Sequence, residues 1–206
     1  MGLRRDLRHP PPAAGTPADP IVDSGMTAAV AFDALDPACP KAVRERQVVV
    51  PVTYWGYDGK VHRGQLAVDR DLAKDVTEVF AIALEHKFPV RSAVPVSQPR
   101  FRKDRAWSDD LSMAADNTSG FNYRPVTGGG ALPNHALGRA VDRNPLLNPY
   151  VKGVVTLPPG ARYDPAAPGT LTADHPVTKA FLARGWAWGG NWTTLKDYQH
   201  LEKPVR

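Results

Sequence analysis

The chain has 206 residues, which fits a single domain of ordinary size, and its 26 Lys and Arg against 21 Asp and Glu give a net charge of +5. Its single cysteine, Cys39, excludes an internal disulfide and any zinc site built from several cysteines. No window approaches the ~18 consecutive apolar residues of a transmembrane helix, so membrane insertion is not expected. The basic residues are scattered, without aromatic alternation or a recognition-helix pattern, so nucleic-acid binding is not expected either.

The N-terminal residues 1–28 are rich in Pro, Ala and Gly and show no apolar periodicity. They are predicted to form a flexible tail ahead of a domain of residues 29–206. The first nine residues are basic, but prolines follow them in place of the apolar core of a secretion signal. No export signal is therefore expected, and the route of any export stays open.

A β-hairpin and a helix are predicted to open the domain. Apolar side chains alternate from Val48 to Tyr54, a turn is expected at 56–59, and a second strand over 61–68. An amphipathic helix follows, with Asp71 as its expected cap and Pro89 as its end.

The second half of the chain is predicted to add a short strand, a long loop and another helix. The strand is expected over 90–96, and the loop over 97–130 is long enough to suggest a functional role. The helix begins near Pro176 and stops at Gly185. The sum is an α+β domain with a small, mostly antiparallel sheet flanked by helices.

Three short segments carry candidate catalytic chemistry. His135 and Asp142 have metal-binding side chains, and Gly138 between them permits a close backbone approach. Asp197 precedes His200 by three residues, which places a carboxylate beside a second histidine on a helix or on a bent strand. Arg124 ends the sequence Ser-Gly-Phe-Asn-Tyr-Arg, where a guanidinium could bind a carboxylate or stabilise an oxyanion.

Taken in order, these segments resemble the D-alanyl-D-alanine carboxypeptidase-type metallopeptidases. The resemblance covers roughly residues 45–203 and is most specific in three stretches: Asn122-Tyr-Arg, His135 to Asp142 with the following Asn-Pro, and the Trp-Gly-Gly-rich run that ends in Asp197-Tyr-Gln-His200-Leu-Glu202. Within this family, the chain looks most like the VanY-like branch, which includes L-alanyl-D-glutamate endopeptidases. This family has a zinc peptidase fold of the Hedgehog and DD-peptidase type.

The resemblance implies a Zn²⁺ site and a set of catalytic residues. His135, Asp142 and His200 would hold the metal, Asp197 would be the catalytic base, and Arg124 would stabilise the oxyanion. Three ligands with nitrogen and oxygen donors leave a fourth position for water, as catalytic zinc requires. The sequence departs from the family pattern at Pro133, where a serine is usual, and at Arg143 and Leu201. These departures bear on substrate preference more than on catalysis.

The implied partner is the peptide stem of peptidoglycan, with action at the bacterial cell wall on its extracellular or periplasmic side. An L-alanyl-D-glutamate endopeptidase is slightly favoured over a D-alanyl-D-alanine carboxypeptidase. The enzyme could be a secreted wall hydrolase, or a lysin delivered by a phage or particle. A catalytically inactive wall-binding module is a further alternative, which Pro133 favours. The oligomeric state stays open.

Overall fold

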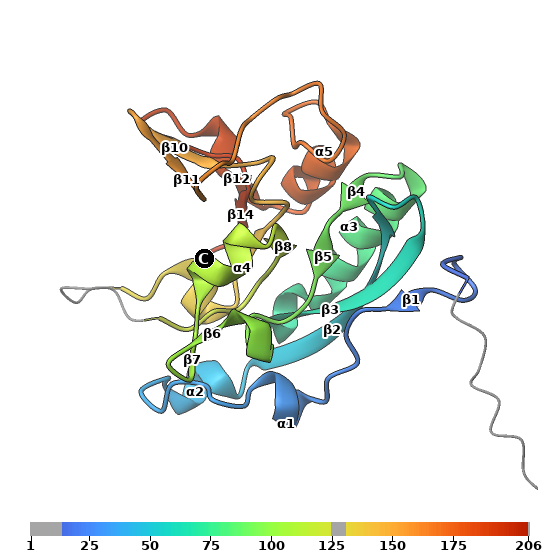
Figure 1. The fold of residues 1–206 in the computed structure, drawn as a ribbon. Helices are drawn as coiled ribbons and strands as arrows, with labels where there is room; N and C mark the ends of the chain where they lie inside the picture. Colours follow the sequence, from blue (N-terminus) through green and yellow to red (C-terminus); the bar gives the residue numbers. More distant parts are fainter. Residues whose placement is uncertain (1–13, 125–130, 206) are drawn as a thin grey trace, which may run out of the picture.

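The computed structural model describes residues 14–124 and 131–205, and a long β-hairpin forms its centre (Figure 1). Strands β2 (Gln47–Gly56) and β3 (Val61–Asp69) pair antiparallel from Gln47↔Asp69 to Trp55↔Val61. Gly59 in the connecting turn has φ +73°, a conformation that glycine adopts at no steric cost. The predicted hairpin is confirmed.

Two short strands extend this hairpin into a four-stranded sheet of order β1-β3-β2-β4. Both outer strands, β1 (Ile21–Val22) and β4 (Pro89–Val90), pair parallel to their neighbours. The predicted mixture of helices and mainly antiparallel strands is confirmed, but the strands are divided among several small sheets.

Helix α3 (Ala73–Glu85) covers one face of the hairpin and confirms the first predicted helix. Val76, Val79, Phe80 and Ala83 form its buried face, at the spacing of an amphipathic helix. The predicted cap was wrong: a short 3₁₀ turn (Arg70–Leu72) precedes the helix, and the Asp69 side chain accepts the hydrogen bond from the Asp71 amide.

Residues 14–28, which the sequence placed in a flexible tail of residues 1–28, belong to the folded part of the chain. Residues 1–13 lie outside the described part of the chain, but residues 14–28 lie against the sheet. The Gly15 carbonyl accepts a hydrogen bond of 2.7 Å from the Val61 amide, and β1 follows. Helices α1 (Ala28–Ala31) and α2 (Lys41–Arg44) then lead into β2. A two-residue strand has no periodicity that a sequence pattern could reveal.

The described part of the predicted loop over 97–130 contains regular structure, while residues 125–130 lie outside the described ranges. It includes a 3₁₀ turn (Pro99–Phe101), the small hairpin β6 (Arg102–Lys103) and β7 (Ala106–Trp107), helix α4 (Asp109–Ala114) and strand β8 (Asn117–Thr118). The strand predicted over 90–96 is two short strands in different sheets, β4 and β5 (Ser92–Ala93), and β5 pairs with β8.

The C-terminal half contains two three-stranded sheets. One, in the order β12-β14-β9, contains β9 (Ala140–Asp142), β12 (Ala187–Trp188) and β14 (His200–Glu202). The other, in the order β11-β10-β13, contains β10 (Tyr150–Lys152), β11 (Val155–Leu157) and β13 (Lys196–Asp197). Two 3₁₀ turns accompany them, η3 (Asn134–Leu137) and η4 (Gly189–Asn191).

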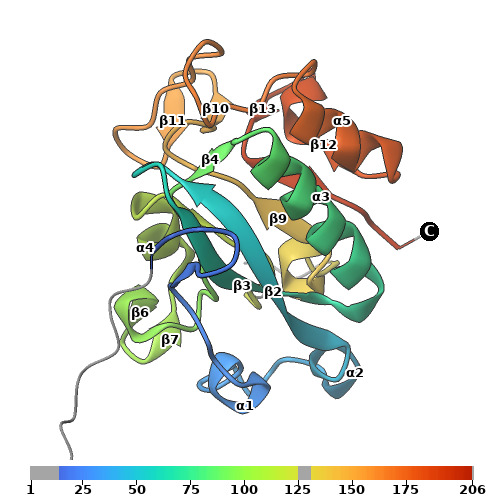
Figure 2. The same cartoon turned by 90° about the vertical axis from the view of Figure 1, so that its right-hand side faces the viewer.

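Helix α5 (Pro176–Ala183) lies beside α3 (Figure 2) and confirms the second predicted helix. His175 caps it, Pro176 occupies its first position, and Gly185 follows its end with φ +80°. The main core joins the hairpin, α3 and α5 to the sheet β12-β14-β9, with Leu66, Phe80, Phe181 and Leu201 among its buried residues. Among the described residues, none of the helices is long and apolar enough to span a membrane.

Candidate metal centre and substrate cleft

The segment that carries His135 and Asp142 is a 3₁₀ turn followed by strand β9, and Gly138 joins the two parts. Gly138 has φ +69°, and a Cβ atom there would overlap the side-chain oxygen of Gln47. The Gly138 carbonyl accepts a hydrogen bond of 2.8 Å from the Asp69 amide, and Gln47 Nε2 donates to the Leu137 carbonyl. The absent side chain therefore lets this segment lie directly on the central hairpin.

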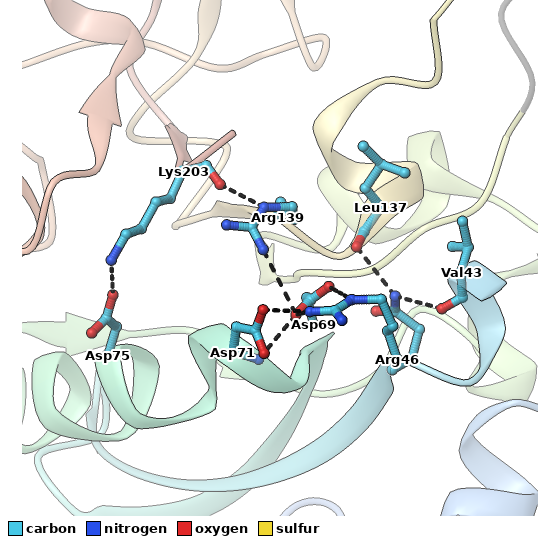
Figure 3. A network of polar contacts seen from close by, with 9 residues as sticks. Val43, Arg46, Asp69, Asp71, Asp75, Leu137, Arg139 and Lys203 are labelled. Carbon is cyan, nitrogen blue, oxygen red and sulfur yellow. Dashed lines mark hydrogen bonds and ion pairs between the residues drawn. The ribbon is translucent and has the colours of Figure 1, made fainter. Parts of the chain in front are cut away.

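A polar network holds the same segment from behind (Figure 3). Arg46 makes a two-pronged contact with Asp69, with N–O distances of 2.7 and 2.9 Å. Arg139 lies 3.7 Å from Asp69 and donates to the Lys203 carbonyl, while the Lys203 ammonium lies 2.8 Å from Asp75 on α3. The network thus ties both ligand-bearing segments, 134–142 and 200–203, to the hairpin and α3.

His135, Asp142 and His200 form a compact cluster. Asp142 and His200 are direct partners on the antiparallel strands β9 and β14. Asp142 Oδ1 lies 3.1 Å from His200 Nδ1, Asp142 Oδ2 lies 3.1 Å from His135 Nε2, and the two imidazole nitrogens lie 3.2 Å apart. All three side chains are nearly buried, with 8–12% of their surface exposed.

Hydrogen bonds on the far side of each imidazole fix which nitrogen faces the cluster centre. His135 Nδ1 lies 2.8 Å from the Gly120 carbonyl, which can only accept, so Nδ1 carries the proton. His200 Nε2 lies 3.0 Å from Glu202 Oε2, and Asn134 holds that carboxylate by a 2.7 Å hydrogen bond. In the neutral rings, His135 Nε2 and His200 Nδ1 therefore turn their lone pairs toward Asp142. Such outer hydrogen bonds are typical of histidines that bind metals.

The buried carboxylate of Asp142 makes positive charge at the centre of the cluster favourable. Burial lowers the pKa of His200, but its hydrogen bonds to Asp142 and Glu202 outweigh burial and raise the pKa to about 10. Burial raises the pKa of Asp142, but the two histidines outweigh it and hold the pKa well below its usual range. A buried carboxylate that faces two imidazoles needs a compensating cation, either protons or a metal ion.

The donor set also fits a metal ion in its spacing. Bonds of about 2.0–2.1 Å, as in protein zinc sites, place tetrahedral ligands about 3.3 Å apart. Here the two imidazole nitrogens are 3.2 Å apart, and each lies 3.1 Å from a different oxygen of Asp142. One ligand atom from each of the three residues lies within 4.8 Å of the other two. Two imidazole nitrogens and one carboxylate are a ligand set of catalytic zinc, which keeps a further position open. The cluster is thus able to hold a metal ion.

Asp197 lies beside this cluster but on the other sheet. It ends β13, where it pairs with Tyr150 of β10, and His200 begins β14 in the sheet of the metal ligands. Between them the Tyr198 amide donates to the Pro149 carbonyl, so the chain bends, as the strand alternative required. Burial and the charge of Asp142 raise the pKa of Asp197 to about 7. Its Oδ1 has no hydrogen-bond partner among the described residues, so this carboxylate can take part in proton transfer.

A cleft of about 430 Å³ joins the cluster, Asp197 and Arg124. Arg124 stands on the wall formed with α4, where its Nη2 lies 2.9 Å from Asp109 Oδ2, and 58% of its side chain is exposed. The cleft is lined by Asp109, Asp110, Met113, Arg124, Pro133, His135, Asp142, Tyr150, Leu157, Asp197, Gln199 and His200. The structure therefore brings together all five residues that the sequence singled out.

Two neighbours of the site were not assigned a role from the sequence. Glu202 orients His200, and its position two residues further along a strand, on the same face, is a signal that could have identified it. Asp109 pairs with Arg124 from a distant segment, and no local pattern indicates that contact. Trp186 and Trp188 lie in the core, whereas the Trp192 ring packs 5.5 Å from the His200 ring.

A family model described as D-alanyl-D-alanine carboxypeptidase matches residues 127–203. The match confirms the resemblance read from the sequence, and it spans His135, Asp142, Asp197 and His200 but not Arg124. No curated protein and no solved structure matches the chain significantly.

Proposed function

We propose that the chain, whose residues 127–203 match a family model described as D-alanyl-D-alanine carboxypeptidase, is a zinc-dependent peptidase that cuts the peptide stems of bacterial peptidoglycan. The observation that carries this proposal is the cluster of His135, Asp142 and His200 at the floor of a cleft that also holds Asp197. A peptidase needs a polarised carbonyl, an activated water and a proton carrier, and this cleft has residues for each task.

We assign the metal to His135 Nε2, Asp142 and His200 Nδ1, the three groups that converge. A zinc ion held there would polarise the scissile carbonyl and lower the pKa of its water toward ~7. Gly120 and Glu202 would keep the two imidazoles in the tautomers that binding needs, through their outer hydrogen bonds.

We assign proton transfer to Asp197 and charge stabilisation to Arg124. Asp197 would accept the proton of the attacking water and return it to the leaving amine. Its Oδ1 has no hydrogen-bond partner among the described residues, and its pKa is raised to about 7, which suits both steps. Arg124, exposed on the opposite wall, would offset the negative charge that develops on the carbonyl oxygen.

The bond that is cut is a finer part of the proposal. An L-alanyl-D-glutamate endopeptidase is favoured slightly, and the description of the matching family supports the D-alanyl-D-alanine carboxypeptidase alternative. Pro133 lines the cleft, and it cannot offer the hydroxyl that a serine would present to the substrate. An inactive wall-binding module is the weaker alternative, because the residues proposed as metal ligands and base all line the cleft.

Digestion of purified peptidoglycan with and without a chelator tests the proposal, with the products identified by mass spectrometry. New L-alanine carboxyl ends and D-glutamate amino ends, lost on chelation and restored by zinc, are expected for the endopeptidase. Release of free D-alanine would keep the metal site and assign the carboxypeptidase reaction. An absence of products from the zinc-loaded protein would contradict the proposal and favour the inactive module. A phage or particle setting, as opposed to secretion, would leave these products unchanged.

A further inference from the structure

One wall of the cleft is a face of the sheet β11-β10-β13, and strand register defines which residues share it. Asp197, Tyr150 and Leu157 are successive cross-strand partners, so their side chains stand in one row on the same face. All three line the cleft. This face therefore runs from the proposed base outward along the hairpin of β10 and β11, which projects from the rest of the chain in Figure 1.

The next row on this face contains Lys152 and Val155. They are direct partners, and each lies two residues from its neighbour in the first row. Same-face residues two apart on a strand are separated by about 7 Å. Lys152 is exposed at the end of β10. It therefore places a flexible cation at the rim of the cleft, one row beyond Asp197.

Other cations near this wall are engaged elsewhere. Lys196 is adjacent to Asp197 on β13, so it belongs to the opposite face, and its ammonium donates to the Gly190 carbonyl at 2.9 Å. Arg124 stands across the cleft, in contact with Asp109. Among the described residues of β10, β11 and β13, Lys152 is the cation on the face that bears Asp197, where it can meet an anionic part of a substrate.

The proposed chemistry puts the leaving residue next to this row. The base that returns a proton to the leaving amine must lie beside that amine, so the leaving residue extends past Asp197. In both candidate bonds this residue carries a carboxylate on its α-carbon: the chain terminus of D-alanine, or the free α-carboxylate of D-glutamate that is linked onward through its side chain.

We propose that Lys152 binds the α-carboxylate of the leaving residue and makes the enzyme select stems in which that group is not amidated. This inference rests on the proposed function, and it names the substrate class that the same site takes. Val155, Leu157 and Tyr150 would cover the apolar part of the leaving residue. Lys152 would act on substrate binding, through a charge-assisted contact.

The test uses synthetic stem peptides in matched pairs, with the zinc-loaded full chain. One pair ends in D-alanine or in its amide, and the other contains D-isoglutamate or D-isoglutamine. For whichever pair is cut, the carboxylate form is expected to have a kcat/KM about tenfold higher. Lys152→Met should abolish that preference by raising KM for the carboxylate form, with kcat, zinc content and the rate on the amide unchanged.

A charge-relocation variant is the matched control. Thr156 lies on the opposite face of the same hairpin, so Lys152→Thr with Thr156→Lys keeps the net charge but moves the cation away from the cleft. Its loss of preference would support a positioned contact, and retained preference would overturn it in favour of general attraction. Equal cleavage of both forms by the unaltered protein would overturn the role of Lys152 and leave the proposed function standing. Cleavage of neither form would overturn both.

Discussion

Glu202 Oε2 lies 3.0 Å from Nε2 of His200, on the side of the ring that faces away from the metal cluster. The contact directs the Nδ1 lone pair of His200 toward Asp142. We expect Glu202→Ala to weaken zinc binding by about 10–100-fold, because metal ligands lose orientation and basicity without such a partner. Competition with a zinc-binding dye measures the change. Glu202→Gln keeps an acceptor, so its zinc affinity should lie between those of the parent protein and the alanine variant. Unchanged zinc affinity in the alanine variant would contradict the role given to Glu202.

Arg124→Ala should keep the metal and lose most of the activity. Removal of one donor to a developing oxyanion typically lowers kcat about 10²–10³-fold. Because Arg124 is largely exposed, its loss should leave the melting temperature unchanged. Steady-state kinetics with zinc analysis of the same sample checks this. Asp109→Asn, which removes the partner but keeps the guanidinium, is the control and should have a smaller effect. Normal turnover in Arg124→Ala would contradict its role.

Asp197→Asn and Asp142→Asn separate the base from the ligand with the same chemical change. Asp197→Asn should bind zinc normally and lower kcat about 10²–10⁴-fold, the usual contribution of a general base. Asp142→Asn should lose zinc as well, because it removes the charged donor that faces both imidazoles. Zinc content of the two purified variants, measured beside their rates, distinguishes the roles. Loss of zinc from both would show that Asp197 also supports the metal.

The sequence predicted those elements in which an apolar pattern repeats over many residues. It missed the short strands that form only by pairing with segments far away in the sequence. The hairpin from Gln47 to Asp69 and the helices α3 and α5 have alternating or helical apolar patterns over eight or more residues. Strands β1, β5 and β8 have two residues each, and their partner residues lie 25 or more positions away. No local window contains that information.

The candidate site shows the same division. His135, Gly138 and Asp142 lie within one short segment, so a local pattern could identify them. That Asp197 and His200 belong to different sheets depends on Tyr150 and Asp142, their respective strand partners, which are remote in sequence. The Arg124–Asp109 contact likewise required the fold. The resemblance therefore singled out five residues that line one cleft, and the structure added how each is oriented.

Asp116 should make stability depend on pH. Burial raises its pKa to about 6, although the Leu146 amide donates a hydrogen bond to it. A carboxyl with a raised pKa favours folding most while it is protonated, so this contribution is lost as the pH rises from about 4 to 6. Asp116→Asn keeps the acceptor and suits the positive φ of +55°, so it should be more stable than the parent by about 1–3 kcal/mol at pH 7.

Urea unfolding of both proteins at pH 4 and pH 7 measures the effect of Asp116, because titrations shared by the pair cancel in the difference. The two should be equally stable near pH 4 and diverge toward pH 7. A difference that stays constant over this range would show that Asp116 does not titrate between the two values.

Arg143→Met should stabilise the protein. Arg143 is fully buried between the rings of Phe80 and Phe88, and none of its guanidinium nitrogens has a hydrogen-bond partner among the described residues. Burial lowers its pKa to about 9, so at pH 7 the folded state bears the full cost of a buried charge. Replacing an inadequately paired buried charge by an apolar side chain typically raises the free energy of unfolding by about 1–4 kcal/mol. The lost contacts with the two rings lower it by about 0.5–2 kcal/mol. The net expected gain is about 1–2 kcal/mol.

Chemical denaturation at pH 7 measures this gain, with zinc present in excess so that metal binding is equal in both proteins. Arg63→Met, on the exposed side of β3, is the matched control and should change the free energy of unfolding by less than about 0.5 kcal/mol. Because the penalty of the buried guanidinium fades as it deprotonates, the advantage of Arg143→Met should shrink above pH 9. A destabilised Arg143→Met variant with normal zinc content would show that the stacked guanidinium contributes more than its burial costs.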